Sequence, residues 1–308
     1  MAGLDPVAYI ETTFGIALKK VGRNEWAGPC PWCGGNDRFH VWERGNYWCR
    51  PGSGHCGAEG WVDKLAGKES PTPEQRLEWR IAKLERQQAE QELRIHHLEE
   101  MHRCKDHLIY HDNLTDEARE YWWREGITDE SIERYLLGWC PSCPMCRESA
   151  SYTIPIFDRQ HQLVNIRHRL EKPNGGKYRP HRANLGIQLF NAGLLDERRD
   201  RIIIAEGEKK GIILTQSGFP AVAITGKRAF LREWLDLFKG IEIVVALDPD
   251  AQKSAHKLGQ LLAEHGAREV RIAQFTEKPD DMIVKRGASS NDIEQYLRWA
   301  RPVRGKTN

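Results

Sequence analysis

The chain has 308 residues, of which 40% are hydrophobic and 29% charged, and its net charge is +2. These values are typical of a soluble chain with a buried core, and the length predicts two or three domains. No run of about 18 apolar residues occurs, which excludes a membrane-spanning helix. The N-terminus lacks the basic and apolar regions of a signal peptide, so we expect a cytoplasmic protein without a membrane partner.

Residues 1–68 predict a small zinc-binding domain built from short strands. Residues 37–42 and 46–49 alternate apolar and polar side chains, which is typical of a hairpin. Two cysteine pairs flank this hairpin, and their spacing predicts one structural Zn²⁺ with all four positions filled by protein. The expected ligands are Cys30, Cys33, Cys49 and Cys56. His55 is an alternative to its neighbour Cys56 as the fourth ligand.

Aromatic and basic side chains surround these cysteines, a combination that suits stacking on unpaired bases. In so small a domain some of the rings must form the core, so we expect one or two of them to contact a single strand. The residues are Trp32, Trp42, Tyr47, Trp48 and Trp61, with Arg38, His40, Arg44 and Arg50.

Residues 69–111 predict a helical arm. Residues 77, 81, 84, 88, 91, 95, 98 and 102 are spaced alternately by four and three, as in a heptad seam. Gln88 and Gln91 make the centre of the seam polar, which disfavours a strong coiled-coil dimer. We therefore interpret this segment as one long helix, or a helical arm, that joins two globular parts.

Residues 112–200 predict an α+β subdomain. Thr115 and Thr128 precede acidic first turns and predict two helix starts in the helical stretch 114–139. Residues 151–158 and 162–170 predict paired strands. Residues 159–182 contain seven basic side chains and one acid, so they form either a phosphate-contacting surface or a solvated loop. The basic residues are Arg159, Arg167, Arg169, Lys172, Lys177, Arg179 and Arg182.

A second cysteine group lies in the same subdomain. Cys140, Cys143 and Cys146 offer three thiols, and Cys104 offers a fourth. His102, His107 and His111 are alternative fourth ligands. A second zinc site and a loop of free thiols both remain open, and an iron–sulfur cluster is less favoured.

From residue 201 onward, buried strands alternate with helices. Strands are expected at 201–207, 220–225, 241–250 and 268–275, with helices at 209–218 and 251–266. This alternation predicts an α/β fold with a mainly parallel sheet, covered on both faces. We assign residues 201–286 to this domain and residues 287–308 to a C-terminal helix and tail.

Acidic side chains follow the strands of this sheet. Glu206 ends the first strand, and Asp248 and Asp250 end the third. Asp280 and Asp281 follow the fourth strand. Because the carboxyl ends of parallel strands meet at one edge, these acids should converge, and Mg²⁺ is their natural counter-charge.

The layout resembles a Toprim domain, and together with the zinc module it resembles bacterial DnaG-type and phage primases. Residues 114–139 are similar to the helical lead-in of the primase core, and residues 151–170 to the strands that follow it. Residues 175–192 are similar to the basic segment that approaches template and nucleotide. The sequence EGEKKG at 206–211 is similar to Toprim-like domains of phage and mobile-element replication proteins.

The resemblance implies catalytic roles for three acids. Glu206 is the acid/base or metal-positioning residue, Asp248 and Asp250 are ligands of Mg²⁺ or Mn²⁺, and Asp280 is a further ligand. Two positions depart from the family: Lys210 and Lys278 stand where primases have acids. The expected nucleic-acid and nucleotide contacts are Arg167, Arg169, Lys177, Tyr178, Arg179 and Lys210.

The resemblance implies synthesis of short RNA primers on a single-stranded DNA template from ribonucleoside triphosphates, in phage, plasmid or mobile-element replication. The chain contains no G-x-x-x-x-G-K-[ST] motif, so a replicative helicase is expected as a partner in trans. One alternative is a non-catalytic protein that binds single strands and recruits the helicase. Another is a Toprim nuclease or topoisomerase, although no separate tyrosine-nucleophile domain is apparent.

Overall fold

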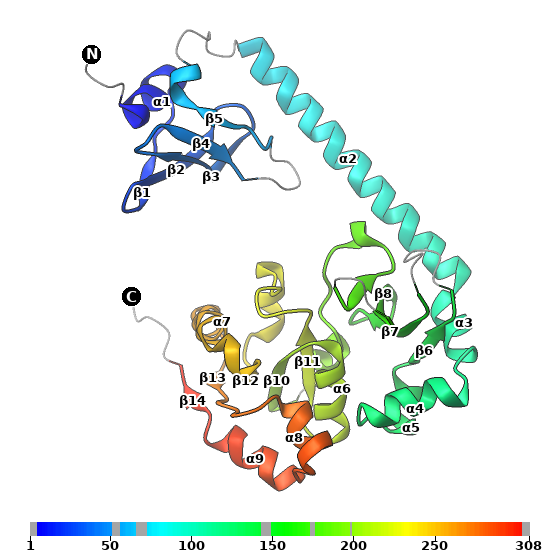
Figure 1. The fold of residues 1–308 in the computed structure, drawn as a ribbon. Coiled ribbons are helices and arrows are strands. Elements are labelled where there is room, and N and C mark those ends of the chain that lie inside the picture. Colours follow the sequence, from blue (N-terminus) through cyan, green and yellow to red (C-terminus); the bar gives the residue numbers. More distant parts are fainter. Residues whose placement is uncertain are drawn as a thin grey trace. The chain divides into compact units, whose positions relative to one another are not determined.

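The chain forms two compact units, Met1–Leu93 and Arg94–Asn308 (Figure 1). The computed structural model describes residues 5–50, 56–65, 73–142, 149–172, 176–197 and 199–303. The long helix α2, Pro73–Cys104, contains the division between the units. The four domain boundaries that we expect from the sequence, after residues 68, 111, 200 and 286, remain predictions.

The first unit is an antiparallel sheet in the order β1-β2-β3-β4-β5, with a helix at its start. The two predicted strands are confirmed as β3 and β4. Helix α1 was not expected, yet Val7, Ile10 and Phe14 have helical spacing, and Asp5 caps the helix by accepting from the amides of Val7 and Ala8. The elements are α1 (Pro6–Phe14), β1 (Lys19–Gly22), β2 (Glu25–Cys30), β3 (Gly34–Trp42), β4 (Asn46–Cys49), β5 (Glu59–Trp61) and η1 (Val62–Lys64).

The predicted arm is helical but is not one helix up to residue 111. Helix α2 ends at Cys104, and Lys105 adopts a left-handed conformation with φ 53°, which interrupts the helical hydrogen bonding. Helix α3, Asp106–Asp112, then follows. The break lets Tyr110 pack into a buried cluster with Met101 and Cys140. Side chains along α2, including Ile81, Leu84 and Ile95, are exposed.

The second unit begins with short helices and an antiparallel sheet in the order β6-β7-β8-β9. Thr115 and Thr128 cap α4 and α5 as predicted. Strand β6 replaces the expected end of the helical stretch. A side chain at Gly138 would lie 2.5 Å from the Tyr110 backbone, so only glycine allows this close packing. The elements are α4 (Asp116–Arg124), α5 (Asp129–Arg134), β6 (Gly138–Cys140), β7 (Ser151–Phe157), β8 (Leu163–Leu170), β9 (Tyr178–Pro180), η2 (Ala183–Leu185) and η3 (Ala192–Asp196).

The larger of the two sheets in the second unit has the order β11-β10-β12-β13-β14. It is parallel except for β14, which confirms the predicted α/β fold. One face of this sheet packs on α6, α8 and α9, and the other packs on α7 and η4. Alternate strand residues point to opposite faces and therefore belong to two separate buried clusters. The elements are β10 (Arg201–Glu206), α6 (Glu208–Gln216), β11 (Ala221–Ile224), η4 (Arg232–Phe238), β12 (Glu242–Ala246), η5 (Pro249–Ala251), α7 (Gln252–Glu264), β13 (Glu269–Ile272), α8 (Pro279–Arg286), α9 (Ser290–Arg298) and β14 (Arg301–Pro302).

A buried chain of polar side chains connects α3 to the antiparallel sheet. Ser151 Oγ lies 2.9 Å from His168 Nδ1, and His168 Nε2 lies 3.0 Å from His181 Nδ1. His181 Nε2 lies 3.2 Å from Asp106 Oδ2. Ser151, His168 and His181 are almost fully buried, so their hydrogen bonds replace those that water would make.

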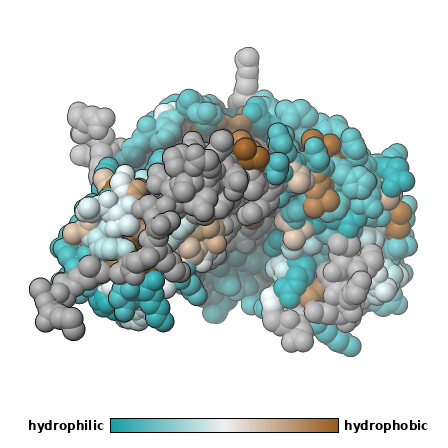
Figure 2. All heavy atoms as spheres, turned by 90° about the horizontal axis from the view of Figure 1, so that it is seen from above, coloured by the Kyte–Doolittle hydropathy of each residue, from teal (hydrophilic) through white to brown (hydrophobic). Residues whose placement is uncertain are grey.

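Much of the described surface visible in Figure 2 is hydrophilic, and the hydrophobic atoms form small separate areas. Among the described helices, none combines the length and the apolar character needed to cross a membrane.

Candidate functional site

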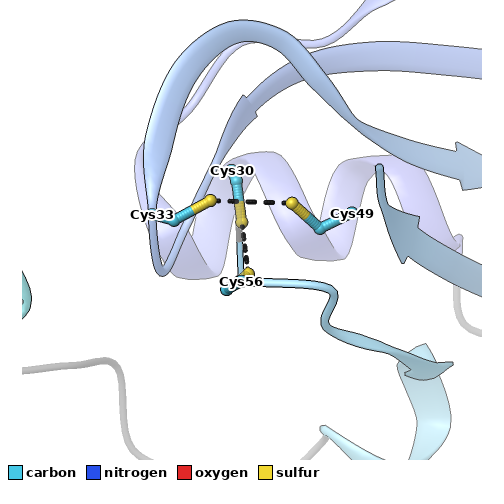
Figure 3. A group of neighbouring side chains, drawn as sticks. All are labelled: Cys30, Cys33, Cys49 and Cys56. Carbon is cyan, nitrogen blue, oxygen red and sulfur yellow. Dashed lines mark hydrogen bonds between the residues drawn. The ribbon is translucent and has the colours of Figure 1, made fainter. Parts of the chain in front are cut away.

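The four predicted zinc ligands lie together in the first unit. Their sulfur atoms are all within 4.8 Å of one another, and they point toward a common centre (Figure 3). Cys30 and Cys33 flank the turn between β2 and β3, Cys49 ends β4, and Cys56 precedes β5. The alternative ligand His55 lies outside the described residues. This arrangement confirms the cysteine cluster, and four thiols at this separation fit tetrahedral Zn²⁺.

Two thiols of this cluster are harder to ionise than an ordinary cysteine. Burial raises the pKa of Cys30 well above its usual value and raises that of Cys49 to about 11. Burial also acts on Cys33, but hydrogen bonds from the backbone of Cys56 and from the neighbouring thiols lower its pKa. A dication would compensate the charge of the thiolates, as structural zinc does.

The aromatic side chains of the first unit, which we call the zinc unit, lie on two opposite faces of its sheet. Trp32 contacts Phe14, Phe39 and Tyr47 and belongs to the core. On the opposite face, His40 stacks on Trp42 with ring centres 6.0 Å apart and contacts Trp48 at 5.9 Å.

The register makes both half-buried indoles neighbours of the imidazole, because His40 pairs with Trp48 across β3 and β4 and lies two residues before Trp42 on β3. Arg38 lies on the same face of β3, two residues before His40. Trp61, on β5, is 47% exposed.

The acidic edge of the second unit is formed by Glu206, Asp248, Asp250 and Asp280. Strands β10 and β12 are direct parallel neighbours, with Ala205 paired to Ala246, so Glu206 and Asp248 follow them at the same end of the sheet. Asp250 lies in η5, and Asp280 is in the first turn of α8, after β13. Gly207, with φ 92°, makes the sharp turn from β10 into α6.

Lysine side chains pair with the aspartates of the acidic edge. Lys210 Nζ lies 2.9 Å from Asp248 Oδ1 and also donates to the Glu206 carbonyl over 2.9 Å. Lys278 Nζ lies 3.6 Å from Asp248 Oδ2. The remaining two pairs are Lys227 with Asp250 at 2.6 Å and Lys209 with Asp280 at 2.9 Å.

The Glu206 carboxyl group is the least compensated member of the edge. Burial, followed by the charge of Asp248, raises its pKa above the ordinary value of 4.5. The ammonium of Lys210 and backbone N–H groups of Asp248 and Lys227 oppose this rise. Its Oε2 is buried without a hydrogen-bond partner.

Asp248 and Asp280 also each have a buried oxygen without a hydrogen bond, Oδ1, although Lys210 Nζ lies 2.9 Å from that of Asp248. Such orphaned oxygens at Glu206 and Asp280 fit a cation. Within the described ranges, however, the cysteine cluster is the only set of three or more potential ligands whose atoms all lie within 4.8 Å.

The predicted nucleic-acid contacts on β8 and β9 differ in how they are held. Arg167 and Arg169 both lie over the Tyr178 ring, at 5.6 and 5.9 Å. Arg167 also forms an ion pair with the buried Glu208, so its positive charge is compensated within the protein. Arg179 donates to backbone carbonyls, and Lys177 is exposed.

The second cysteine group is only partly described. Cys143 and Cys146 lie outside the described residues. Cys140 is buried in β6, and Cys104 is exposed at the end of α2. The predicted second zinc site therefore remains a prediction.

Sequence reasoning missed Lys209 and Lys227 as partners of the acids, as well as the Arg167–Glu208 pair. The two lysines directly after Glu-Gly-Glu were a usable signal for Lys209. They lie in the first turn of the helix that follows Glu206, and this turn must lie at the same edge of the sheet as Glu206. Lys227 follows β11, the other neighbour of β10, and topology could have indicated it.

No protein-family model and no curated protein matches the sequence. Solved structures do match. The zinc-binding and RNA polymerase domains of the Aquifex aeolicus primase align over 97% of this chain and 84% of that one, with a TM-score of 0.56 and 18% identity. The DnaG primase catalytic domain bound to ssDNA aligns over 70% of this chain and 83% of its own, with a TM-score of 0.56 and 18% identity.

A DNA primase domain from Pseudomonas aeruginosa aligns over 65% of this chain and 78% of that one, with a TM-score of 0.54 and 18% identity. The predicted resemblance is thus confirmed at the level of the fold. The chain has the fold of the zinc-binding and RNA polymerase domains of DnaG-type primases.

Proposed function

We propose that this chain is a DNA primase that makes short RNA primers on single-stranded DNA from ribonucleoside triphosphates. The observation that carries the proposal is the position of Glu206 and Asp248 at the ends of two adjacent parallel strands. In an open α/β sheet this is where chemistry is located. The fold shared with primases over nearly the whole chain supports the same reading.

The proposed reaction joins a primer 3′-hydroxyl to the α-phosphate of a nucleotide and releases pyrophosphate. A divalent cation, Mg²⁺ or Mn²⁺, would supply charge for this step when bound at the acidic edge, where Glu206 and Asp280 have unpaired buried oxygens. Glu206 is also the proposed acid/base or metal-positioning group, because it ends β10 beside β12 and its Oε2 is buried without a hydrogen-bond partner.

Basic side chains of the second unit would hold template and triphosphate. Arg169 and Tyr178 form a stacked pair on neighbouring strands, and Arg179 and Lys177 lie beside them in sequence. Lys210 reaches the acidic edge itself. Arg167 contributes by positioning Tyr178, since its own charge is paired with Glu208.

The zinc unit would contact the template through the face that carries His40, Trp42 and Trp48. These half-buried rings contact one another, as suits a platform for unpaired bases. The similar DnaG catalytic domain was solved with ssDNA. A mobile-element or phage role, with a replicative helicase as partner, completes the proposal, and the Glu206–Gly211 motif supports that role.

Primer synthesis tests this function directly. The zinc-loaded chain is incubated with single-stranded DNA, labelled ribonucleotides, and Mg²⁺ or Mn²⁺, and the products are separated on a denaturing gel. Short RNA products that depend on template and divalent metal support the proposal. Complete absence of product with both metals, from protein that still binds DNA, would refute it.

One observation favours a second candidate, a non-catalytic protein that binds single strands and recruits a helicase. The three aspartates of the acidic edge are already ion-paired with lysines. The same assay separates the two candidates, because the second predicts DNA binding without primer synthesis.

A further inference from the structure

The aspartates of the acidic edge have protein cations as their nearest counter-charges. Asp248 has two, Lys210 at 2.9 Å and Lys278 at 3.6 Å. Asp280 has Lys209 at 2.9 Å. A set of acids that binds several divalent ions normally repels itself until the metals arrive, whereas this set is largely neutralised by the chain.

Lys210 is the most deeply placed of these cations. Its side chain is 12% exposed and that of Asp248 is 10% exposed, so the pair is shielded from water. The ammonium is also anchored by the Glu206 carbonyl, 2.9 Å away. Because Lys210 belongs to α6 and Asp248 follows β12, two separate elements hold the charges together.

A divalent ion at Asp248 would therefore meet a fixed positive charge. Two cations near one carboxylate repel each other strongly where water is excluded. Displacing the ammonium from Asp248 would leave the buried Lys210 charge without its partner. This cost opposes the exchange of lysine for metal.

We propose that Lys210, assisted by Lys278, takes the place of a divalent cation at Asp248, so that the acidic edge binds at most one divalent ion, beside Glu206. The role of that ion in primer synthesis rests on the proposed function, but the binding of the ion does not. The two lysines are thus determinants of metal stoichiometry at this site.

Binding of Mn²⁺ to the full, zinc-loaded chain tests the proposal without any measurement of activity. Mn²⁺ is titrated and followed by electron paramagnetic resonance. The Mn²⁺ that belongs to the edge is defined as the part lost in the double variant Glu206→Gln, Asp248→Asn. We expect at most one such ion per wild-type chain.

Two substitutions at Lys210 should change this binding in different ways. Lys210→Met removes the competing charge and should tighten Mn²⁺ binding by about tenfold or more. Lys210→Asp supplies a ligand oxygen and should raise the stoichiometry by about one ion. Lys210→Arg keeps the positive charge and should bind Mn²⁺ within about twofold of wild type.

The matched control is Lys239→Met, which breaks a lysine–aspartate pair of similar length, 2.7 Å to Asp236, outside the acidic edge. It should leave Mn²⁺ binding unchanged. Two or more edge ions in the wild type, or an affinity that Lys210→Met does not alter, would overturn the proposal.

A variant whose folding is safe provides a second test. The Lys278 side chain is 53% exposed, so Lys278→Met should melt as wild type does and bind Mn²⁺ about threefold more tightly. If Lys210→Met loses its cooperative melting transition, an unchanged affinity in Lys278→Met overturns the proposal by itself. A failed primer assay combined with the expected Mn²⁺ results would instead reject only the proposed function.

Discussion

Arg167 Nε lies 3.3 Å from Glu208 Oε1, and this ion pair joins strand β8 to the first turn of the helix that follows Glu206. The Glu208 side chain is 4% exposed and that of Arg167 is 18% exposed. A basic residue expected to contact nucleic acid therefore connects the antiparallel sheet to the acidic edge.

Removal of Arg167 should destabilise the second unit. Arg167→Ala leaves the Glu208 carboxylate buried without a counter-charge, which costs about 3–5 kcal/mol for a pair of this kind. Urea unfolding followed by circular dichroism measures the loss. The double variant Arg167→Met, Glu208→Gln should recover most of it, and a double variant no more stable than Arg167→Ala would show that the ion pair is not the cause.

Loss of the two aspartates after β12 should abolish primer synthesis and leave DNA binding intact. In Asp248→Ala, Asp250→Ala, the acidic edge keeps Glu206 and Asp280 but loses half of its carboxylates, whereas the basic strands are unchanged. Extension assays and fluorescence anisotropy measure the two properties. Asp236→Ala, at an exposed aspartate paired with Lys239, is the control. Full activity in the double variant would remove these acids from the mechanism.

Glu206→Gln should make the second unit more stable at neutral pH. Because burial and Asp248 raise the pKa of Glu206, its ionised form is disfavoured in the folded state, and the resulting destabilisation develops as pH rises above the ordinary value of 4.5 and is complete above the folded pKa. The melting temperature of Glu206→Gln should therefore exceed that of wild type at pH 7, and the difference should vanish as pH falls below 4.5. Scans without added divalent metal measure it. A difference that persists at low pH would contradict this explanation.

Trp48→Ala should weaken binding of single-stranded DNA. Stacking of one base on an aromatic ring contributes about 1–3 kcal/mol, so we expect an affinity loss of about fivefold or more. Titration of labelled oligonucleotides at fixed salt measures the change. Trp299, which is 71% exposed in the second unit, provides the control variant Trp299→Ala. Equal losses in both variants would exclude a specific role for the His40–Trp48 face.

Zinc removal should unfold the first unit alone. Its buried cluster is small and includes Cys30 and Cys49, so we expect the fold to depend on a metal ion bound by these side chains. In Cys49→Ser we expect loss of near-ultraviolet dichroism from the tryptophans of this unit and an unchanged melting transition of residues 94–308. Metal analysis of wild type should give about one zinc per chain, and two would establish the second cysteine site.

Local sequence signals predicted the parts of the fold that depend on neighbouring residues. The cysteine spacing at Cys30 and Cys33, the caps at Thr115 and Thr128, and the alternation of strands and helices after residue 201 all have local causes. Each of these features is confirmed.

The features that sequence reasoning missed depend on contacts between distant segments. The left-handed Lys105 ends α2 where Tyr110 must turn into a core made by β6 and β8. Strand β6 exists because Gly138 packs against the backbone of α3. The pairing of Lys210 with Asp248 depends on the sheet register, which places residues 38 positions apart side by side. A local sequence pattern does not indicate which distant residues come into contact.

When both imidazoles are neutral, the polar chain from Ser151 to Asp106 has a single direction of proton donation. The Asp106 carboxylate can only accept, so His181 carries its proton on Nε2. With both imidazoles neutral, His181 Nδ1 must then accept from His168 Nε2, and His168 Nδ1 must accept from the Ser151 hydroxyl. One carboxylate on α3 thereby determines the tautomers of two rings and the orientation of a hydroxyl on β7, and none of these can reverse alone.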